Sequence, residues 1–174
     1  MKKILFNDKF CLTQEVLSGN KTMTRRLLKD NVPLGNWEET AKHLSYKVGE
    51  VVAIAQSYKT IYSEIEGKDA AEKIKKEYEN TAGWNNKMFV KADLLPHHIR
   101  ITDVKVERLQ EISEEDALRE GIEEFCFDYF LPNDYSKPFL MPRDAFAFLI
   151  DKVGKKGDWD KNPLVAAYTF ELVD

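Results

Sequence analysis

The chain has 174 residues, 43% of them apolar and 32% charged, and its formal net charge is −4 at pH 7. This composition predicts one globular domain that can bury a core, and the acidic balance argues against indiscriminate binding to nucleic acid. No apolar run approaches the ~20 residues of a membrane span, and no signal-like segment follows the N-terminal lysines. We therefore expect a cytoplasmic protein that does not contact a membrane.

The first half of the chain is predicted to contain strands, helices and one long insertion. Short apolar runs indicate buried strands, and a glycine after an apolar helical pattern indicates a helix end. In chain order we expect a strand at 4–6, a helix capped by Asp8 and ended by Gly19, a strand or extended arm at 22–26, a turn-rich loop at 30–47 and a core strand at 51–55. Residues 59–95 form the insertion, with a lysine- and glutamate-rich surface helix at 67–80.

The second half has clearer periodicity. Residues 99–106 alternate apolar and polar side chains, as a strand with one buried face does. Ser113 and the acids after it begin a helix that Gly121 ends, and Pro142 begins another helix. A last strand is expected at 164–173. This order of elements predicts the α+β class, with a small mixed barrel and peripheral helices.

Neither the cysteines nor the histidines suggest a disulfide or a metal site. Cys11 and Cys126 occur at unrelated spacing, so we expect buried, reduced thiols. His97 and His98 are adjacent and would fall on opposite faces of a strand, which disfavours a shared metal ion. We therefore expect no metal and no other cofactor.

Residues 19–26, with the sequence GNKTMTRR, hold the densest group of chemically useful side chains. A lysine can accept a proton when it is neutral, a threonine can act as a nucleophile, and arginines bind anions. An exposed basic edge strand explains the same residues equally well, because strand edges often carry lysine. Both interpretations stay open on spacing alone.

Several motifs occur in an order that resembles the ASCH (activating signal cointegrator homology) family, in the version common in phage and bacterial genomes. They are the lysine–threonine–arginine motif at 19–26, the segment VGEVV at 48–52, the run from Ile101 to Ile122, and the segment WDxNPxV at 159–165 with Phe170 and Glu171 after it. The resemblance implies a PUA-like β-barrel in a single domain of residues 1–174, with the helical insertion at about 59–95 as its least familiar part. It also implies recognition of RNA or of a modified nucleotide.

In one small bacterial branch of that family, the barrel is an amidohydrolase that acts on N4-acetylcytidine and uses a lysine, a threonine and a glutamate. By motif position these roles would fall on Lys21, Thr24 and Glu120. A threonine hydroxyl needs a neighbouring base to take its proton, and burial or nearby cations such as Arg25 and Arg26 would lower the pKa of a lysine toward that role. The carboxylate would orient the lysine or protonate the departing amine.

Geometry limits this hypothesis. In a flat strand Lys21 and Thr24 would face opposite sides, so the catalytic arrangement requires a turn or bulge after Gly19. Glu120 is equally explained as a surface acid near a helix end. Arg26 either binds an anion or pairs with an acid of the segment that follows Ser113. These alternatives stay open.

Two further residues are candidates for substrate binding besides Arg25 and Arg26. Tyr168 would stack on a base or fill the core, and Asn162 would read a base edge or set the turn into the last strand. We therefore expect a nucleoside or RNA as a partner, and a protein partner for the 59–95 insertion. The alternative to an amidohydrolase is a module that binds RNA or a modified nucleotide without catalysis.

Overall fold

The structure is a computed structural model that describes residues 1–173. It confirms the α+β class, since the described residues form both α-helices and two β-sheets. These residues divide into two compact units: the first holds residues 1–6, 51–99 and the end of the last strand, and the second holds residues 7–50 and 100–171. Among residues 1–173 no helix is long and apolar enough to cross a membrane. The expectation of a single domain stays a prediction.

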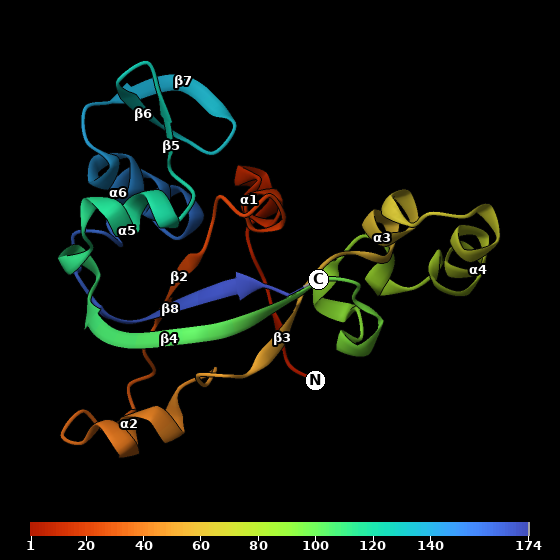
Figure 1. Ribbon diagram of the computed structural model, residues 1–174, viewed down its shortest axis with the longest axis horizontal. Helices are drawn as coiled ribbons and strands as arrows, with labels where there is room; N and C mark the ends of the chain where they lie inside the picture. Colours follow the sequence, from red (N-terminus) through yellow and green to blue (C-terminus); the bar gives the residue numbers. More distant parts are fainter. Residues whose placement is uncertain (174) are drawn as a thin grey trace. The chain divides into compact units, whose positions relative to one another are not determined.

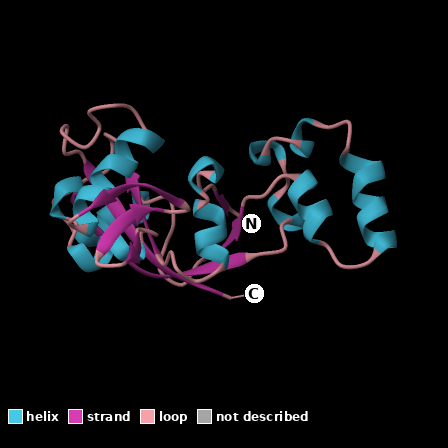
Figure 2. Cartoon of the chain, turned by 90° about the horizontal axis from the view of Figure 1, so that it is seen from above, coloured by secondary structure: helices cyan, strands magenta, loops and turns pink. Residues whose placement is uncertain are grey.

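The first unit is mainly helical (Figure 2). Strand β1 (Lys3–Ile4) pairs in parallel with β3 (Val51–Ile54), where Lys3 lies opposite Ala53. The elements after β3 are the helices α3 (Tyr58–Glu64) and α4 (Lys68–Tyr78) and the short 3-10 helices η2 (Ala82–Trp84), η3 (Lys87–Phe89) and η4 (Ala92–Leu94). The predicted helix of the insertion is therefore confirmed.

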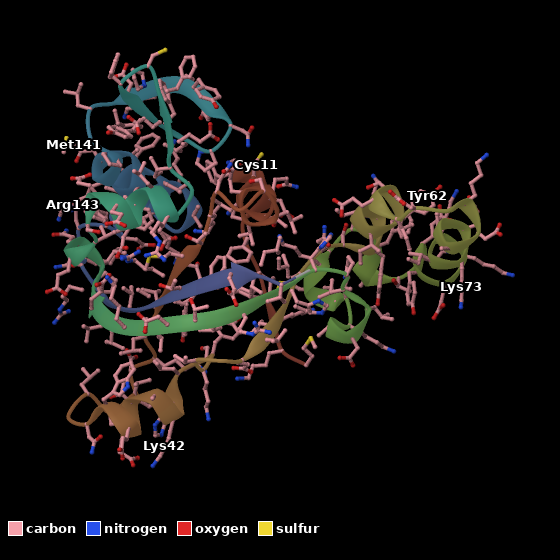
Figure 3. The ribbon with its side chains drawn as sticks, viewed as in Figure 1. Cys11, Lys42, Tyr62, Lys73, Met141 and Arg143 are labelled. Atoms are coloured by element: carbon pink, nitrogen blue, oxygen red, sulfur yellow. The ribbon has the colours of Figure 1, made fainter. Side chains whose placement is uncertain are left out.

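An aromatic pair holds α3 against α4. The rings of Tyr58 and Tyr78 stack with their centroids 4.0 Å apart, and a small apolar core surrounds Tyr58. Gly83 lies against the Tyr58 ring, and a Cβ at this position would be 2.5 Å from a ring carbon. A residue larger than glycine would therefore clash with the ring. Lys73 points away from this core on the exposed face of α4 (Figure 3).

Three strands of the larger β-sheet are neighbours in the second unit, in the order β4, β8, β2. They are β2 (Met23–Leu27), β8 (Leu164–Leu172) and β4 (His98–Arg108), whose first residues belong to the first unit. Strand β2 runs antiparallel to β8, with Arg25 opposite Ala167. The strand pairings of residues 1–173 do not close a barrel, so the PUA-like barrel stays a prediction.

Helices cover the strands of the second unit on both sides. Helices α5 (Glu114–Arg119) and α6 (Pro142–Val153) pack against each other on one side of β4 and β8, and α2 (Trp37–His43) lies on the other side (Figure 1). The predicted cap of α5 is confirmed, because Ser113 Oγ accepts the N–H of Asp116 at 3.1 Å. The N–H of Arg143 donates to the Glu114 carboxylate at 2.9 Å and so ties the start of α6 to α5. The remaining helical segments are η1 (Asp8–Phe10), α1 (Leu12–Leu17) and η5 (Leu109–Glu111).

Three local expectations differ from the structure. Residues 30–47 contain α2, because Asn36 caps a helix there by accepting the N–H of Glu38 at 2.8 Å. Asn7, one position before Asp8, supplies the cap at the start of η1. Both cysteines are free, but the expected burial is wrong for both: Cys11 is partly exposed, and Cys126 is exposed because it lies in a hairpin turn.

Residues 123–139 form a small antiparallel sheet that sequence periodicity does not predict. Its strands are β5 (Glu123–Phe125), β6 (Asp128–Leu131) and β7 (Asp134–Phe139), in that order. They are short, and β7 is exposed over most of its length, so no alternation of buried and exposed side chains marks it. The Glu123 carboxylate links this sheet by accepting the N–H of Asn133 and the O–H of Tyr135.

The turn between β5 and β6 is conformationally unfavourable for its residues. It consists of Cys126 and Phe127, whose φ angles are 50° and 69°, and the pair Phe125 and Asp128 closes it. Such a two-residue turn normally contains Asn-Gly, because a left-handed residue with a Cβ costs about 1–2 kcal/mol. Phe127 is 94% exposed, so burial of its ring does not offset this cost.

We expect the double substitution Cys126→Asn with Phe127→Gly to raise the free energy of unfolding by about 1–2 kcal/mol, because it relieves the left-handed backbone. Urea denaturation would measure the change. Phe127→Ala is the matched control: it removes the exposed ring but keeps a Cβ, and we expect a change within about 0.5 kcal/mol. Equal gains from both variants would contradict the backbone explanation.

Candidate functional site

The backbone after α1 holds Lys21 between two helices. Gly19 follows α1 with a φ of 81°, a left-handed conformation that turns the chain. The N–H of Lys21 then donates to the carbonyl of Glu15 at 2.8 Å, and the N–H of Thr22 donates to the carbonyl of Arg119 at 2.9 Å. The chain therefore turns at Gly19, and these two hydrogen bonds tie the segment after it to both α1 and α5.

Lys21 and Glu120 form a buried ion pair. The Lys21 Nζ donates to Glu120 Oε2 at 2.6 Å and to the Glu120 carbonyl at 2.8 Å, and the two side chains are 2% and 5% exposed. Gly121, in a left-handed conformation with a φ of 101°, turns the chain at the end of α5 and keeps Glu120 against Lys21. The structure thus brings together two of the three predicted catalytic residues and places Glu120 in the interior.

Arg25 joins this pair to two more carboxylates. Its NH1 donates to Glu120 Oε1 at 3.0 Å, its Nε and NH2 donate to Glu107 Oε1 at 3.0 and 2.6 Å, and its NH2 also donates to Asp116 Oδ2 at 2.9 Å. The side chain is 1% exposed. Arg25 therefore pairs with acids of the segment after Ser113, and the same pairing for Arg26 stays a prediction.

Lys105 binds the same carboxylates from β4. Its Nζ lies 2.8 Å from Asp116 Oδ2 and 3.1 Å from Glu107 Oε2, and its side chain is half-exposed. The closest ion pairs join three carboxylates to three cations, and Arg119 NH1 lies farther away, 3.6 Å from Asp116 Oδ1. We call this network the carboxylate cluster; its members are Lys21, Arg25, Lys105, Glu107, Asp116 and Glu120.

Burial and neighbouring charges shift the pKa values of the basic residues. Burial lowers the pKa of Lys21 below its ordinary value; contact with Glu120 opposes this effect, and the charges of Arg26 and Arg25 add to it. Burial also lowers the pKa of Arg26. Burial acts in the same direction on Arg25, but the carboxylates of Glu120 and Glu107 outweigh it and raise that pKa. A lowered pKa moves Lys21 toward the role of a base.

Protonation of Asp116 is expected to lower the free energy of unfolding of the chain in acid. Burial alone would raise the pKa of this carboxyl, but hydrogen bonds from Lys105 and Arg25 hold it below its ordinary value of 3.8. Because the pKa is lower in the folded chain than in the unfolded chain, the ionised group contributes stability above the unfolded pKa. This contribution is lost as the pH falls through the folded pKa.

We expect Asp116→Asn to lower the free energy of unfolding by about 1–3 kcal/mol at neutral pH, since the buried Arg25 and the half-exposed Lys105 lose an ionised partner. The difference from the wild type should shrink below about pH 4. Urea denaturation at neutral and acid pH would measure it, with Asp103→Asn, an exposed acid on β4, as the control. A difference that is independent of pH would contradict the assignment.

Thr24 lies outside the hydrogen bonds of the carboxylate cluster. Side chains alternate along β2, so Thr24 and Arg26 share the face opposite to Arg25. Within residues 1–173 no hydrogen bond joins the Thr24 hydroxyl to Lys21 or Glu120. Arg26 is nevertheless close enough for its charge to lower the pKa of Lys21. A site shared by the three predicted catalytic residues stays a prediction.

The other two candidates take part in the protein's own packing. Tyr168 is 1% exposed and meets the ring of Tyr46 edge-on, with the centroids 5.3 Å apart. The Asn162 Oδ1 accepts the N–H of Gln110 at 2.9 Å and holds the turn before β8. Both contacts agree with the structural alternatives left open above, and the roles of these residues in substrate binding stay predictions.

Sequence reasoning missed three members of the carboxylate cluster. Lys105 and Glu107 are two positions apart on β4 and share a face, a spacing that is a usable signal. Asp116 reads in the sequence as one of the acids at the start of a helix, and nothing nearby indicates that its carboxylate reaches Arg25. No group of three or more His, Cys, Asp or Glu side chains in the described part of the chain is placed to hold a metal ion.

Comparisons of the chain with known proteins identify no family and no function. No model of a protein family matches the chain, and no curated protein matches it. Among solved structures, the chain is similar to protein EF3133 of the DUF984 family from Enterococcus faecalis V583, with 16% sequence identity and a TM-score of 0.44. The aligned region covers 94% of this chain and 67% of the other.

Proposed function

We propose that the chain is a PUA-like protein of the ASCH type that binds a nucleoside or a modified RNA base beside Lys21 and Glu120, and that it hydrolyses the exocyclic amide of an N4-acylated cytidine. The observation that supports this most is the 2.6 Å contact between Lys21 Nζ and Glu120 Oε2. These residues are 99 positions apart, and they are two of the three that the family resemblance assigns to catalysis. The lowered pKa of Lys21 is a second support.

The proposed chemistry needs one proton acceptor and one proton donor. In its neutral form the Lys21 amine takes a proton from a water molecule, or from the Thr24 hydroxyl, as the oxygen attacks the carbonyl carbon of the amide. The C–N bond then breaks, and the exocyclic nitrogen leaves with the proton that Lys21 has taken, which the ammonium delivers directly or through the Glu120 carboxylate as a relay. Water finally releases the acid if Thr24 was acylated. The products are a carboxylic acid and the free amine of cytidine.

The direct test is to incubate the purified protein with N4-acetylcytidine and to follow the release of cytidine and acetate by chromatography. We expect both products in equal amounts, with no added metal. Heat-denatured protein is the blank. Absence of turnover with N4-acetylcytidine and with longer N4-acyl cytidines would refute the hydrolase proposal.

A specific observation favours a second function, which is binding without catalysis. In residues 1–173 the Thr24 hydroxyl makes no hydrogen bond to Lys21 or Glu120, so this hydroxyl is not aligned with the proposed base. A non-catalytic module of this kind would bind RNA or a modified nucleotide in a salt-sensitive manner and form no product. Binding of N4-acetylcytidine without release of acetate would favour this alternative.

A protein partner for the 59–95 insertion also stays a proposal. Met88 and Phe89 are large apolar side chains in that segment, and both are 64% exposed. They are therefore the first residues to substitute in a test for a protein partner. We expect the double substitution Met88→Ser with Phe89→Ser to leave nucleoside binding unchanged.

A further inference from the structure

A second candidate ligand site lies in the second unit, at the end of α6. It is a pocket with a volume of about 300 Å³. Most of its wall is aliphatic, and the residues that form that part are Leu27, Leu109, Ile150, Val153, Pro163 and Val165. We propose that this pocket binds a small, neutral, mainly apolar molecule that carries one hydrogen-bond acceptor. The proposal does not depend on the amidohydrolase function.

The size and lining of the pocket fit such a ligand. Ligand pockets in proteins usually have volumes from about 300 Å³ upward and are lined mostly by apolar side chains with a few polar groups. A dry cavity of about 150 Å³ lined by aliphatic and aromatic residues is already large enough to bind benzene. A molecule with a single ring and a short substituent therefore fits the volume found here.

Arg25 supplies the polar group of the pocket. It lines the pocket while its side chain is 1% exposed to solvent. A guanidinium carries five N–H donors, and its contacts with Glu107, Asp116 and Glu120 are four hydrogen bonds. One N–H on NH1 is therefore not used in these four hydrogen bonds, and in the proposed complex it donates to the acceptor atom of the ligand.

The charges around the pocket select a neutral ligand. Arg25 already contacts three carboxylates, so an anion beside it would meet negative charge close by. The other two charged residues of the wall, Asp158 and Lys161, pair with each other at 2.6 Å. Neither a cation nor an anion would find an unmatched partner there, whereas a carbonyl or ether oxygen would accept the remaining N–H of Arg25.

Two probes of equal size test this proposal. Acetophenone carries a carbonyl oxygen, and α-methylstyrene, which has a CH2 group in place of that oxygen, has nearly the same shape without a comparable acceptor. Each is titrated into protein with 13C-labelled methyl groups, and the chemical shifts of Ile150, Val153 and Val165 are followed by NMR. We expect saturable shifts at these methyl groups and about fivefold tighter binding of acetophenone, the effect of one hydrogen bond.

Variants establish where the probes bind. Val153→Trp places a large ring at the half-exposed end of the pocket and should abolish the shifts, while Lys152→Trp, next to it on α6 but outside the wall, should not. Leu27→Trp, at an exposed position of the wall, is a second blocking variant if the first is poorly folded. Absence of saturable shifts, equal affinity for the two probes, or unchanged binding in both blocking variants would overturn the proposal.

Discussion

Replacing Arg25 by methionine is expected to lower the free energy of unfolding by about 3–5 kcal/mol, the usual cost of removing one partner from a buried ionic network. The guanidinium holds the carboxylates of Glu107, Asp116 and Glu120 through four hydrogen bonds. Methionine fills much of the space but donates none of these bonds. Glu107 and Asp116 keep Lys105, and Glu120 keeps Lys21, so the loss is large without being total.

Urea and thermal denaturation would measure the effect of Arg25→Met. The matched control is Arg100→Met on β4, because Arg100 pairs with Glu171 at 3.1 Å while both side chains are about half exposed. Surface pairs of this kind contribute about 0–1 kcal/mol. If the two arginine variants were equally stable, the carboxylate cluster would not be the stabilising network described above.

Replacing Lys21 by methionine is expected to lower both stability and activity. Glu120 retains its hydrogen bond from Arg25 at 3.0 Å, so we expect the free energy of unfolding to fall by about 3 kcal/mol, the lower end of the usual cost of removing one partner of a buried ion pair. Loss of the proposed base should reduce turnover of N4-acetylcytidine on the order of 10²–10⁴-fold. Steady-state kinetics together with denaturation would measure both effects.

Lys105→Met is the matched control for this experiment. Lys105 pairs with the same cluster, but its side chain is 46% exposed and contacts neither Lys21 nor Glu120 in the ion pairs described. We expect this variant to retain turnover. Full activity in Lys21→Met would eliminate this residue as the base, and equal losses in both lysine variants would point to a general effect of the cluster.

The lowered pKa of Lys21 also predicts a dependence on pH. Because the folded pKa lies below the ordinary value of 10.5, the unfolded chain binds this proton more tightly than the folded chain does. The stability of the wild type relative to Lys21→Met should therefore rise with pH from the folded pKa up to about pH 10.5. A relative stability that falls over this range would mean that contact with Glu120 outweighs burial.

Elements with strong local signals could be predicted from the sequence. Helix α5 begins at the hydroxyl of Ser113, α6 begins at Pro142, and β4 follows the alternation seen at 99–106. Each of these signals depends on residues only a few positions apart, so the local sequence contains it. The small sheet at 123–139 could not be predicted in this way, because its strands are short and mostly exposed and are held by pairing with one another.

The candidate site was predictable only in part. Residues 19–26 and Glu120 were singled out by side-chain chemistry and by family resemblance, and the structure places Lys21 and Glu120 in contact. The part played by Arg25 was not predictable, since Glu107, Asp116 and Glu120 lie 82, 91 and 95 positions away from it. The sequence gives no indication of which of two adjacent arginines faces these acids; the register of β2 on β8 decides it.

The sequence by itself determined the α+β class, the positions of the main helices and strands, and a short basic segment worth testing as a site. The tertiary structure alone decided which charges meet, how deeply they are buried, and that an apolar pocket opens beside Arg25. The physical reason is the separation along the chain of the residues that interact. Capping and periodicity act between neighbours in the chain, whereas the pKa of Lys21 depends on groups that folding brings to it from distant positions.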